Sequence, residues 1–284
     1  MTVNELYRSF LSELSSTHSS HEASNITSMI FEHFAGIDRS SLIKFPDEVL
    51  DEEKITAIND SLVALKKNKP VQYIIGEAWF YKMKLKVSAA VLIPRPETEE
   101  LVEAVIHAVK NKPATKIIDI GTGSGCIAIA LKKNIVSSAI TAIDISADAL
   151  NIAKENAANQ SAIINFLQSD FLSAENNKGL EKYDVIVSNP PYIPKKELEQ
   201  MDKNVTAYEP HTALFVENDQ PLIFYERIHA FAKDHLNEHG MIFLETHEDL
   251  AEAVCKLFDT RMYKTAIKND LFGKQRMVIL TRYQ

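Results

Sequence analysis

The sequence of 284 residues holds little cysteine, glycine or tryptophan, with two, eight and one of them respectively. Cys126 and Cys255 cannot by themselves form a disulfide framework or a zinc site. No apolar run approaches the roughly 18 residues of a membrane span. The first residues also lack the basic start and apolar core of a signal peptide. We therefore expect a protein of the reduced cytoplasm that has no membrane segment.

Positive charge is also scarce, with 31 Lys and Arg against 39 Asp and Glu, which gives a net charge of −8. Acidic residues outnumber basic ones within residues 1–75 as well. This balance argues against broad, non-specific binding to nucleic acid, although a local basic groove stays possible. We expect no stable complex with nucleic acid.

Residues 1–75 predict a small helical domain. Thr2 with Glu5 and Ser19 with Glu22 form capping-box patterns ahead of amphipathic runs. A further helix is expected over about 51–67. The domain either stabilises its neighbour or binds a partner, and its sequence alone favours neither.

Residues 76–93 predict a β-hairpin that links this domain to a catalytic domain over 94–284. Within positions 79–87, the lysines at 82, 84 and 86 alternate with apolar residues at 83, 85 and 87, as in a strand or hairpin. Positions 91–93 predict another short strand. The rigid turn 94–99 starts a helix that continues to Val109. Arg95 could bind a carboxylate or only pair with a neighbouring Glu, and the roles of Arg95 and Glu97 stay open.

From residue 116 onward, predicted strands alternate with helices. Helices are expected from about 127, over 146–159, over 222–238 with Gly240 as a C-cap, and over 247–258. This alternation predicts an α/β fold with a mostly parallel, seven-stranded, Rossmann-like sheet and helices on both faces. The seven strands are expected at 116–120, 139–143, 163–167, 183–187, 241–245, 263–267 and 277–281.

Three of the eight glycines fall within one loop between a predicted strand and helix, at Gly121, Gly123 and Gly125. They allow a tight turn on which a ligand can lie. The spacing differs from that of dinucleotide-binding loops and has no Walker-type ending. Asp119, two residues before the first glycine, suits a ligand with an ammonium group, such as S-adenosylmethionine.

Two further strands end in acidic residues. Asp144 can accept hydrogen bonds from both hydroxyls of a ribose. Asp170 and Phe171 offer a carboxylate for the amino group of an adenine and a ring for its face. Since open α/β sheets bind ligands at the carboxyl ends of their strands, we expect these residues to gather at one edge.

A stiff turn, Ser188 followed by Asn189, Pro190, Pro191 and Tyr192, comes directly after the fourth strand. The prolines lack N–H groups and hold φ near −65°. Asn189 adds one side-chain acceptor and two donors, while Tyr192 adds a flat ring. This cradle suits a planar NH2 group, from either an amide or a nucleobase. The oxygen of Asn189 and the carbonyl of Pro190 could accept its two N–H bonds, and Tyr192 could stack on it.

One competing pattern concerns a metal. His235, Glu238 and His239 match the His-x-x-Glu-His spacing of one class of zinc peptidases. They fall in the last turn of a predicted helix, where exposed histidines also suit the helix dipole. The sequence offers no convincing third ligand, and the other histidines form no cluster. We therefore expect no metal site.

The sequence resembles the protein-(glutamine-N5) methyltransferases known as PrmC or HemK, which modify peptide-chain release factors. The resemblance covers nearly the whole chain. Residues 92–99 and 209–214 single out the glutamine enzymes, because the Asn-Pro-Pro-Tyr turn also occurs in adenine-N6 methyltransferases. The resemblance as a whole rests on residues 70–76, 92–99, 119–125, 144, 170–171, 188–192 and 209–214.

This resemblance implies a class I S-adenosylmethionine-dependent enzyme whose product is S-adenosylhomocysteine. Asn189 to Tyr192 would hold the glutamine of the Gly-Gly-Gln motif in class-1 release factors, and the helical domain would help to dock these factors in translation termination. We expect a monomer. The residues implied in contacting the cofactor are Gly121, Thr122, Gly123, Ser124, Gly125, Asp144, Phe171 and Asn189.

Two other hypotheses stay open. The rival enzyme is an adenine-N6 methyltransferase for DNA or RNA that uses the same cradle, although the negative charge speaks against it. In the other, the helical domain binds a ribosomal factor and the sheet only retains a ligand. That second hypothesis leaves the donor site and the acceptor cradle unexplained.

Overall fold

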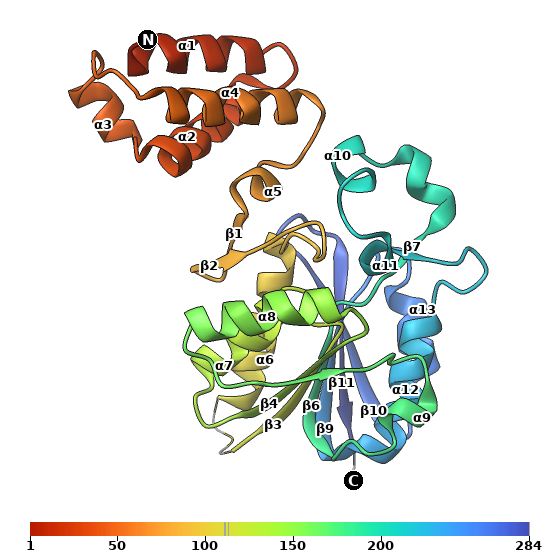
Figure 1. Cartoon of the computed structure of the whole chain (residues 1–284). Coiled ribbons are helices and arrows are strands. Elements are labelled where there is room, and N and C mark those ends of the chain that lie inside the picture. Colours follow the sequence, from red (N-terminus) through yellow and green to blue (C-terminus); the bar gives the residue numbers. More distant parts are fainter. Residues whose placement is uncertain (111, 113, 284) are drawn as a thin grey trace. The chain divides into compact units, whose positions relative to one another are not determined.

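The computed structural model describes residues 1–110, 112 and 114–283, and the chain forms two compact units (Figure 1). The helical unit consists of Met1–Gly76 with Asp202–Tyr208, and the sheet unit of Glu77–Met201 with Glu209–Gln284. The sequence had assigned residues 202–208 to the catalytic domain and 76–93 to a separate linker. In the structure the first segment joins the helical unit, and all but Gly76 of the second joins the sheet unit.

The helical unit begins with the two predicted caps. Thr2 and Glu5 form both bonds of a capping box, and Ser19 accepts a bond from the backbone of Glu22. Within the described residues, every helix is too short or too polar to cross a membrane. The helices of the unit are α1 (Val3–Leu14), α2 (Ser20–Ala35), α3 (Arg39–Lys44), α4 (Glu52–Lys66), α5 (Val71–Ile75) and α10 (Lys203–Thr206).

This unit has its own hydrophobic core, built from α1, α2, α4 and α5. Phe10 and Phe31 are almost fully buried and meet edge to face with their ring centroids 5.9 Å apart. The hydroxyl of Tyr208 donates to the carbonyl oxygen of Lys67 over 2.8 Å. This bond ties the late segment 202–208 to the end of α4.

The sheet unit is organised around seven strands in the order β10-β11-β9-β6-β3-β4-β5. The five strands from β9 to β5 run parallel, while β11 is antiparallel to both of its neighbours. This arrangement confirms the predicted fold. The strands are β3 (Lys116–Ile120), β4 (Ala139–Asp144), β5 (Asn165–Gln168), β6 (Tyr183–Ser188), β9 (Leu236–Glu245), β10 (Tyr263–Asn269) and β11 (Gln275–Arg282).

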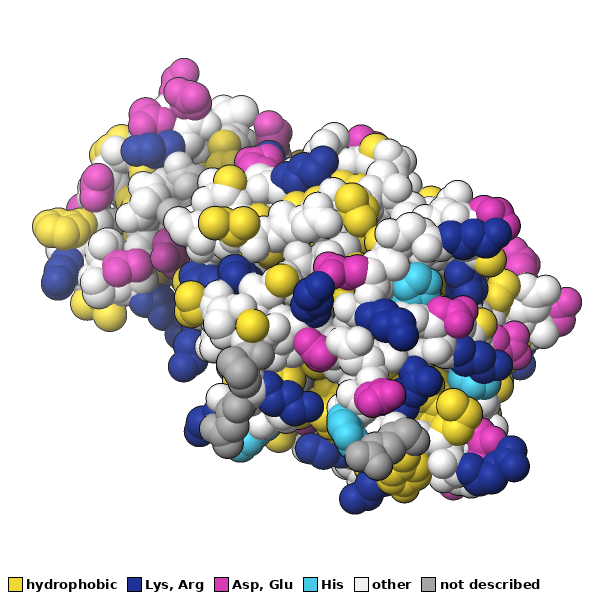
Figure 2. Space-filling view, turned by 90° about the horizontal axis from the view of Figure 1, so that it is seen from below, with side chains coloured by type: hydrophobic (Ala, Val, Ile, Leu, Met, Phe, Trp, Pro, Cys, Tyr) yellow, Lys and Arg dark blue, Asp and Glu magenta, His cyan; other side chains and the backbone are white. Residues whose placement is uncertain are grey.

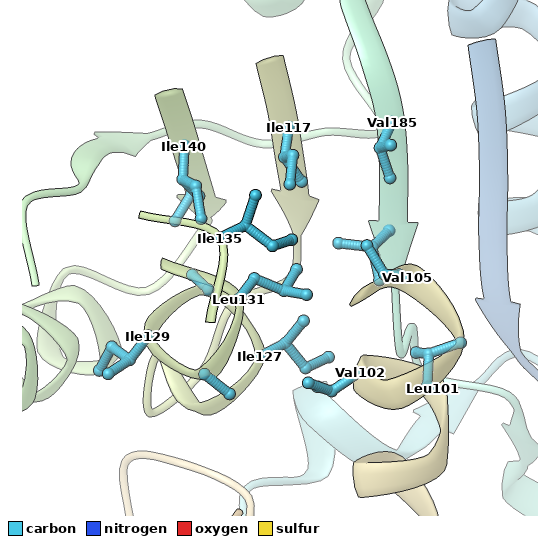
Figure 3. Close-up of a cluster of buried hydrophobic side chains, with 14 of the residues drawn as sticks. Leu101, Val102, Val105, Ile117, Ile127, Ile129, Leu131, Ile135, Ile140 and Val185 are labelled. Atoms are coloured by element: carbon cyan, nitrogen blue, oxygen red, sulfur yellow. The ribbon is translucent and has the colours of Figure 1, made fainter. Parts of the chain in front are cut away.

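Helices cover both faces of this sheet (Figure 1). On one face lie α6 (Pro96–Val109), α7 (Cys126–Asn134) and α8 (Ala147–Asn159), and on the other lie α12 (Ile223–His235) and α13 (Ala251–Leu257). Figure 3 shows apolar side chains of β3, β4 and β6 facing those of α6 and α7. A rigid scaffold of this kind holds the strand ends in fixed positions.

Short elements surround the sheet. Strands β1 (Glu77–Phe80) and β2 (Met83–Lys86) form the predicted hairpin. The two residues between them, Tyr81 and Lys82, have φ of 47° and 62°, as in a type I′ turn. The remaining elements are α9 (Ala174–Asn177), β7 (Ile193–Pro194), η1 (Lys195–Gln200), α11 (His211–Leu214) and β8 (Phe215–Val216), with β7 and β8 paired in parallel.

The predicted helix 222–238 is wrong at its end, because α12 stops at His235 and the strand begins at Leu236. Gly240 is no C-cap. A Cβ at Gly240 would lie 2.7 Å from the Leu236 side chain, so close packing at an irregularity of the β6–β9 ladder requires the glycine. His235 and His239 therefore lie on a helix and a strand, and the peptidase-like spacing loses its helical geometry.

Two other predictions need correction. Residues 91–93 form no strand, because the backbone N–H of Ile93 donates to the carboxylate of Glu209 over 3.1 Å. The helix expected over 247–258 is the shorter α13. Before it, the N–H of Leu250 bonds to the carbonyl oxygen of His247 in a turn.

Candidate active site

The carboxyl ends of four parallel strands bring most of the predicted site residues together. In the sheet register, Ile120 of β3 lies opposite both Ile143 of β4 and Ser188 of β6, and Ser188 lies opposite Leu244 of β9. This edge contains the point at which the strand order reverses, where open α/β sheets bind ligands. The residues that follow the paired positions are therefore neighbours: Gly121, Asp144, Asn189 and Glu245.

The glycine loop after β3 adopts backbone conformations that favour glycine. Gly121, Gly123 and Gly125 have φ of 75°, 53° and 81°. The N–H of Gly121 donates to the carbonyl oxygen of Ile143 over 2.9 Å, which binds the loop to the neighbouring strand. A Cβ at Gly125 would lie 3.1 Å from that of Ala153, so the loop also packs tightly on α8.

Asp119, near the end of β3, is fully buried. Its Oδ2 accepts a hydrogen bond of 2.6 Å from the hydroxyl of Thr122 within the loop. Its Oδ1 has no hydrogen-bond partner among the described residues. Burial raises the pKa of Asp119 to about 7, against the opposing effect of the Thr122 bond, and the nearby Asp144 adds to the rise. Asp119 thus holds beneath the glycine loop one buried carboxylate oxygen that the Thr122 hydroxyl leaves unbonded.

Asp144 ends β4 and connects the loop to the next helix. Its Oδ2 accepts from the N–H of Gly123 over 2.8 Å, and its Oδ1 accepts from the N–H of Ser146 over 2.9 Å. Burial raises the pKa of Asp144, and these backbone bonds oppose the rise. Each oxygen keeps a second lone pair, so the fixed carboxylate can still accept from two hydroxyls.

Asp170 and Phe171 follow β5 and face different surroundings. Asp170 is half-buried, and its Oδ1 accepts from the N–H of Leu172. Phe171 is 5% exposed and packs edge to face on Phe231. The guanidinium carbon of Arg227 lies over the Phe171 ring, 5.4 Å from its centroid. The ring therefore belongs to the core beneath this edge, and its stacking on an adenine stays a prediction.

The turn after β6 is held by a chain of hydrogen bonds. The Nδ2 of Asn189 donates to the hydroxyl oxygen of Thr98 over 3.2 Å, and this hydroxyl donates to Oε2 of Glu245 over 2.7 Å. The hydroxyl of Tyr192 donates to Oε1 of the same carboxylate over 3.3 Å. Glu245 thus connects both ends of the turn.

Glu245 is buried at the end of β9. Burial raises its pKa to about 7, and Glu97 adds to the rise, whereas Thr98, Arg276 and Tyr192 oppose it. Burial also raises the pKa of Tyr192 far above its ordinary value, with Glu245 as a further cause, so Tyr192 stays a hydroxyl donor.

Pro190 and Pro191 complete the turn. Pro190 is buried and Pro191 is half-buried, and neither has an N–H group that could compete for an acceptor. The hydroxyl of Ser188 donates to the carbonyl oxygen of Ile120 over 2.7 Å, which fastens the start of the turn to β3. The acceptor groups of the cradle therefore stand on a rigid support.

A second contact concerns Arg95, whose role the sequence left open. Its guanidinium lies 2.5 Å from Oε1 of Glu209, a carboxylate with 1% of its side chain exposed. Together with the bond from Ile93, this pair joins the segment before α6 to the loop before α11. Arg95 therefore pairs with a glutamate, but with one that is distant in the sequence.

Sequence reasoning missed three residues of this edge. Thr98 and Glu209 lie within stretches that already stood out in the sequence, at 92–99 and 209–214. Glu245 is the last residue of a predicted strand, and Asp144 also stands at a strand end, so the strand-end rule could have found Glu245. The bond from Thr98 to Glu245 spans 147 positions and that from Ile93 to Glu209 spans 116, which no local pattern encodes.

Comparison with known proteins identifies the family. Residues 5–76 match the family model described as the PrmC N-terminal domain, and residues 98–207 match the methyltransferase small domain. The catalytic domain of hMettl16, in complex with the MAT2A 3'UTR hairpin 6, shares the fold with a TM-score of 0.57, 15% identity, and coverage of 88% of this chain and 93% of that one.

Curated relatives cover both units. The release factor glutamine methyltransferase of Flavobacterium psychrophilum is 38% identical over 98% of each chain. That of Streptococcus pneumoniae is 40% identical over 99% of this chain and 98% of its own. Such identity over almost the full length of both proteins extends well beyond a shared fold. The chain therefore belongs to the family of release factor glutamine methyltransferases.

Proposed function

We propose that this protein transfers a methyl group from S-adenosylmethionine to the side-chain nitrogen N5 of the glutamine in the Gly-Gly-Gln motif of class-1 release factors. The observation that carries the proposal is the hydrogen-bonded turn at Asn189, whose side-chain oxygen is left to accept a bond beside the glycine loop. Membership of the family supports the choice of substrate.

The residues at the strand ends fit S-adenosylmethionine. The unpaired Oδ1 of Asp119 suits its ammonium group, and the carboxylate of Asp144 suits its ribose hydroxyls. The glycine loop, held open by positive φ angles, offers a surface without side chains. When bound, the cofactor supplies a methyl group on a positively charged sulfur. We assign the remaining contacts to Thr122, Ser124, Asp170 and Phe171.

The cradle holds the acceptor nitrogen in place. An amide nitrogen is a weak nucleophile because its lone pair is delocalised into the carbonyl group. Oδ1 of Asn189 and the carbonyl oxygen of Pro190 accept its two N–H bonds and stabilise the positive charge that develops there. The ring of Tyr192 packs on the planar amide, with its hydroxyl anchored on Glu245. After transfer the nitrogen is positively charged and acidic and releases one of its two protons to water, so the site needs no strong base beforehand.

The helical unit is proposed to help dock the release factor. Its sequence matches the PrmC N-terminal domain over residues 5–76. The unit has a hydrophobic core of its own, and it carries side chains such as Ile43 and Phe45 that are 81% and 58% exposed. A partner protein could cover such side chains.

An adenine in DNA or RNA would fit the same cradle but is not favoured. The net charge is −8, and on the face in Figure 2 the Lys and Arg side chains are interspersed with Asp and Glu. A phosphate backbone binds best where positive charge is concentrated. The relatives described above are named for release factors.

The test is to offer the purified full chain labelled S-adenosylmethionine with a class-1 release factor, and separately with adenine-containing DNA or RNA. Mass spectrometry should locate the methyl group on the Gly-Gly-Gln glutamine, and replacing that glutamine by Ala should abolish transfer. Asn189→Ala should lower the rate by at least about 100-fold. Label on nucleic acid alone, or an Asn189→Ala variant at the wild-type rate, would contradict the proposal.

A further inference from the structure

We infer that Thr98 and Glu245 are positioning residues that fix the side-chain amide of Asn189 with its oxygen toward the acceptor and hold Tyr192 through the same carboxylate. The inference rests on the proposed function for its role in catalysis. The orientation itself follows from the hydrogen-bond chain in the free protein.

The direction of each bond in the chain follows from simple chemistry. Above its pKa of about 7 Glu245 is an ionised carboxylate, which only accepts hydrogen bonds, so the single hydroxyl proton of Thr98 then points to Glu245 over 2.7 Å. The oxygen of Thr98 then has only lone pairs left for Asn189. It therefore binds the NH2 end of the amide, at 3.2 Å, and the oxygen end must point away.

Burial makes this preference strong. Thr98 and Glu245 are each 2% exposed, so water cannot replace a lost partner. A flipped Asn189 would bring its oxygen against the lone pairs of Thr98 and leave a buried acceptor unpaired. Such a mismatch is costly inside a protein, whereas the same flip in water is nearly free.

One carboxylate controls both sides of the turn. Glu245 holds Asn189 through Thr98, and it holds Tyr192 directly over 3.3 Å. The backbone oxygen of Glu245 also accepts from the buried hydroxyl of Tyr225 over 3.0 Å, which fixes the end of β9. Removal of the Glu245 charge should therefore disturb the acceptor oxygen and the aromatic ring together.

Protonation of Glu245 should reverse the chain of bonds. A protonated carboxyl can donate to Thr98, whose hydroxyl can then donate to Asn189 and favour the flipped amide. The ionisable groups that influence Glu245 come from several elements: Glu97 of α6, Arg276 of β11 and Tyr192 of the turn. Tyr225 of α12 is a hydroxyl donor whose pKa is raised well above its ordinary value by burial. Low pH should thus give the same amide orientation as loss of the charge.

The first test reads the orientation without any catalysis. The protein is labelled with 15N-asparagine, and Asn189→Ala identifies the side-chain NH2 signal of Asn189. In the wild-type protein we expect one Nδ2 proton of Asn189 to exchange slowly with water. Its exchange should be about tenfold faster in Thr98→Val and should return to the slow rate in Thr98→Ser. Thr141→Val removes another buried hydroxyl, on β4, and serves as the control. Equal exchange in wild type and Thr98→Val would overturn the inference.

The second test asks whether Thr98 acts through Asn189. Thr98→Val should lower kcat by about 10- to 100-fold with little change in KM for the cofactor, and Thr98→Ser should recover most of the rate. Adding Thr98→Val to Asn189→Ala should cost nothing further. Additive losses, or a Thr98→Val variant with normal kcat, would overturn the positioning role. If wild type methylates no release factor, the proposed function fails, and the exchange test still decides the orientation.

Discussion

Asp119 combines complete burial with an unpaired carboxylate oxygen, and this combination predicts a pH-dependent affinity for the cofactor. Its pKa is raised to about 7, so below that pH the carboxyl must lose its proton to meet an ammonium group. We expect affinity for S-adenosylmethionine to fall about tenfold per pH unit below 7. Calorimetry at pH 6 and 8, in buffers of different ionisation enthalpy, should also detect proton release on binding at pH 6.

Two variants check that Asp119 causes this dependence. Asp119→Asn should bind more weakly at pH 8 and lose most of the change with pH, leaving the smaller contribution of Asp144. Asp234→Asn, at an exposed position of α12, should behave like wild type. Equal affinity of the wild-type protein at pH 6 and 8 would contradict the prediction.

Glu245 predicts a second effect of pH, on stability. Its pKa is raised from 4.5 to about 7, so the folded state holds the proton more tightly than the unfolded state. The stability associated with this group is fully present below pH 4.5 and is lost as the pH rises through 7. The loss is on the order of 3 kcal/mol at most.

Urea unfolding at pH 5 and pH 8 measures this effect. The wild-type protein should lose more free energy of unfolding between the two pH values than Glu245→Gln, which has no charge to bury. A variant that loses as much as wild type would show that Glu245 does not titrate in this range.

At the scale of elements, the glycine loop predicts a contrast between two glycines. Gly125→Ala meets both a φ of 81° and side chains of Ala153 and Ile129 at 3.1 Å. We expect a loss of about 2 kcal/mol in the free energy of unfolding. Gly179→Ala meets open space at ordinary φ, and should change stability by less than about 0.5 kcal/mol. Similar stability of the two variants would argue against a tightly packed loop.

The ion pair of Arg95 with Glu209 joins the segment before α6 to the loop before α11, and its loss should lower the free energy of unfolding. Among the described residues, Arg95→Ala leaves the buried carboxylate of Glu209 with only the N–H of Ile93, and should cost about 2 to 4 kcal/mol of stability. Arg261→Ala breaks a pair in which the arginine is 88% exposed and solvent screens the charges, so it should cost much less than Arg95→Ala. Denaturant unfolding compares the two, and equal small losses would contradict the role of Glu209 as a buried anchor.

The sequence predicted the elements whose patterns are local. The strands 116–120 and 183–187 are short apolar runs, and the structure confirms both, with β6 extended by Ser188. The strand at 241–245 was predicted as well, but its first five residues, 236–240, were assigned to a helix and its cap, because the glycine that resembles a helix cap instead permits a close approach within β9. Sequence patterns give the type of an element more readily than they give a packing contact made elsewhere in the fold.

The site also divides into residues that a local sequence pattern reveals and contacts that only the folded structure reveals. Asn189 and Asp144 could be found because turn residues and strand ends have local signatures, and the register places them on either side of the end of β3. Thr98 lies in a stretch that stood out and Glu245 ends a predicted strand, but the bond between them appears only when a helix start and a distant strand end meet. The fold was predictable because it repeats one local unit, and the hydrogen-bond chain was not.

At the scale of the whole molecule, the two units have separate cores, and a core mutation in one should spare the other. Phe10 is 1% exposed, and Phe10→Ala should cost the helical unit about 3 to 5 kcal/mol. Hydrogen exchange should become faster in residues 1–76 and 202–208, while the strands of the sheet unit and affinity for S-adenosylmethionine stay unchanged. Faster exchange in β3 or β6 would show that the units unfold together.

The path of the chain between the units has a consequence for how the protein is made. The helical unit includes residues 202–208, which the ribosome adds only after β3, β4, β5 and β6. A domain that begins at residue 1 is therefore completed late in translation, when four strands of the other unit have already been synthesised. The hydroxyl of Tyr208 can close on Lys67 only at that stage. Although residues 1–76 are synthesised first, the helical unit is completed only once residue 208 has been added, which is still ahead of β9, β10 and β11 of the sheet unit.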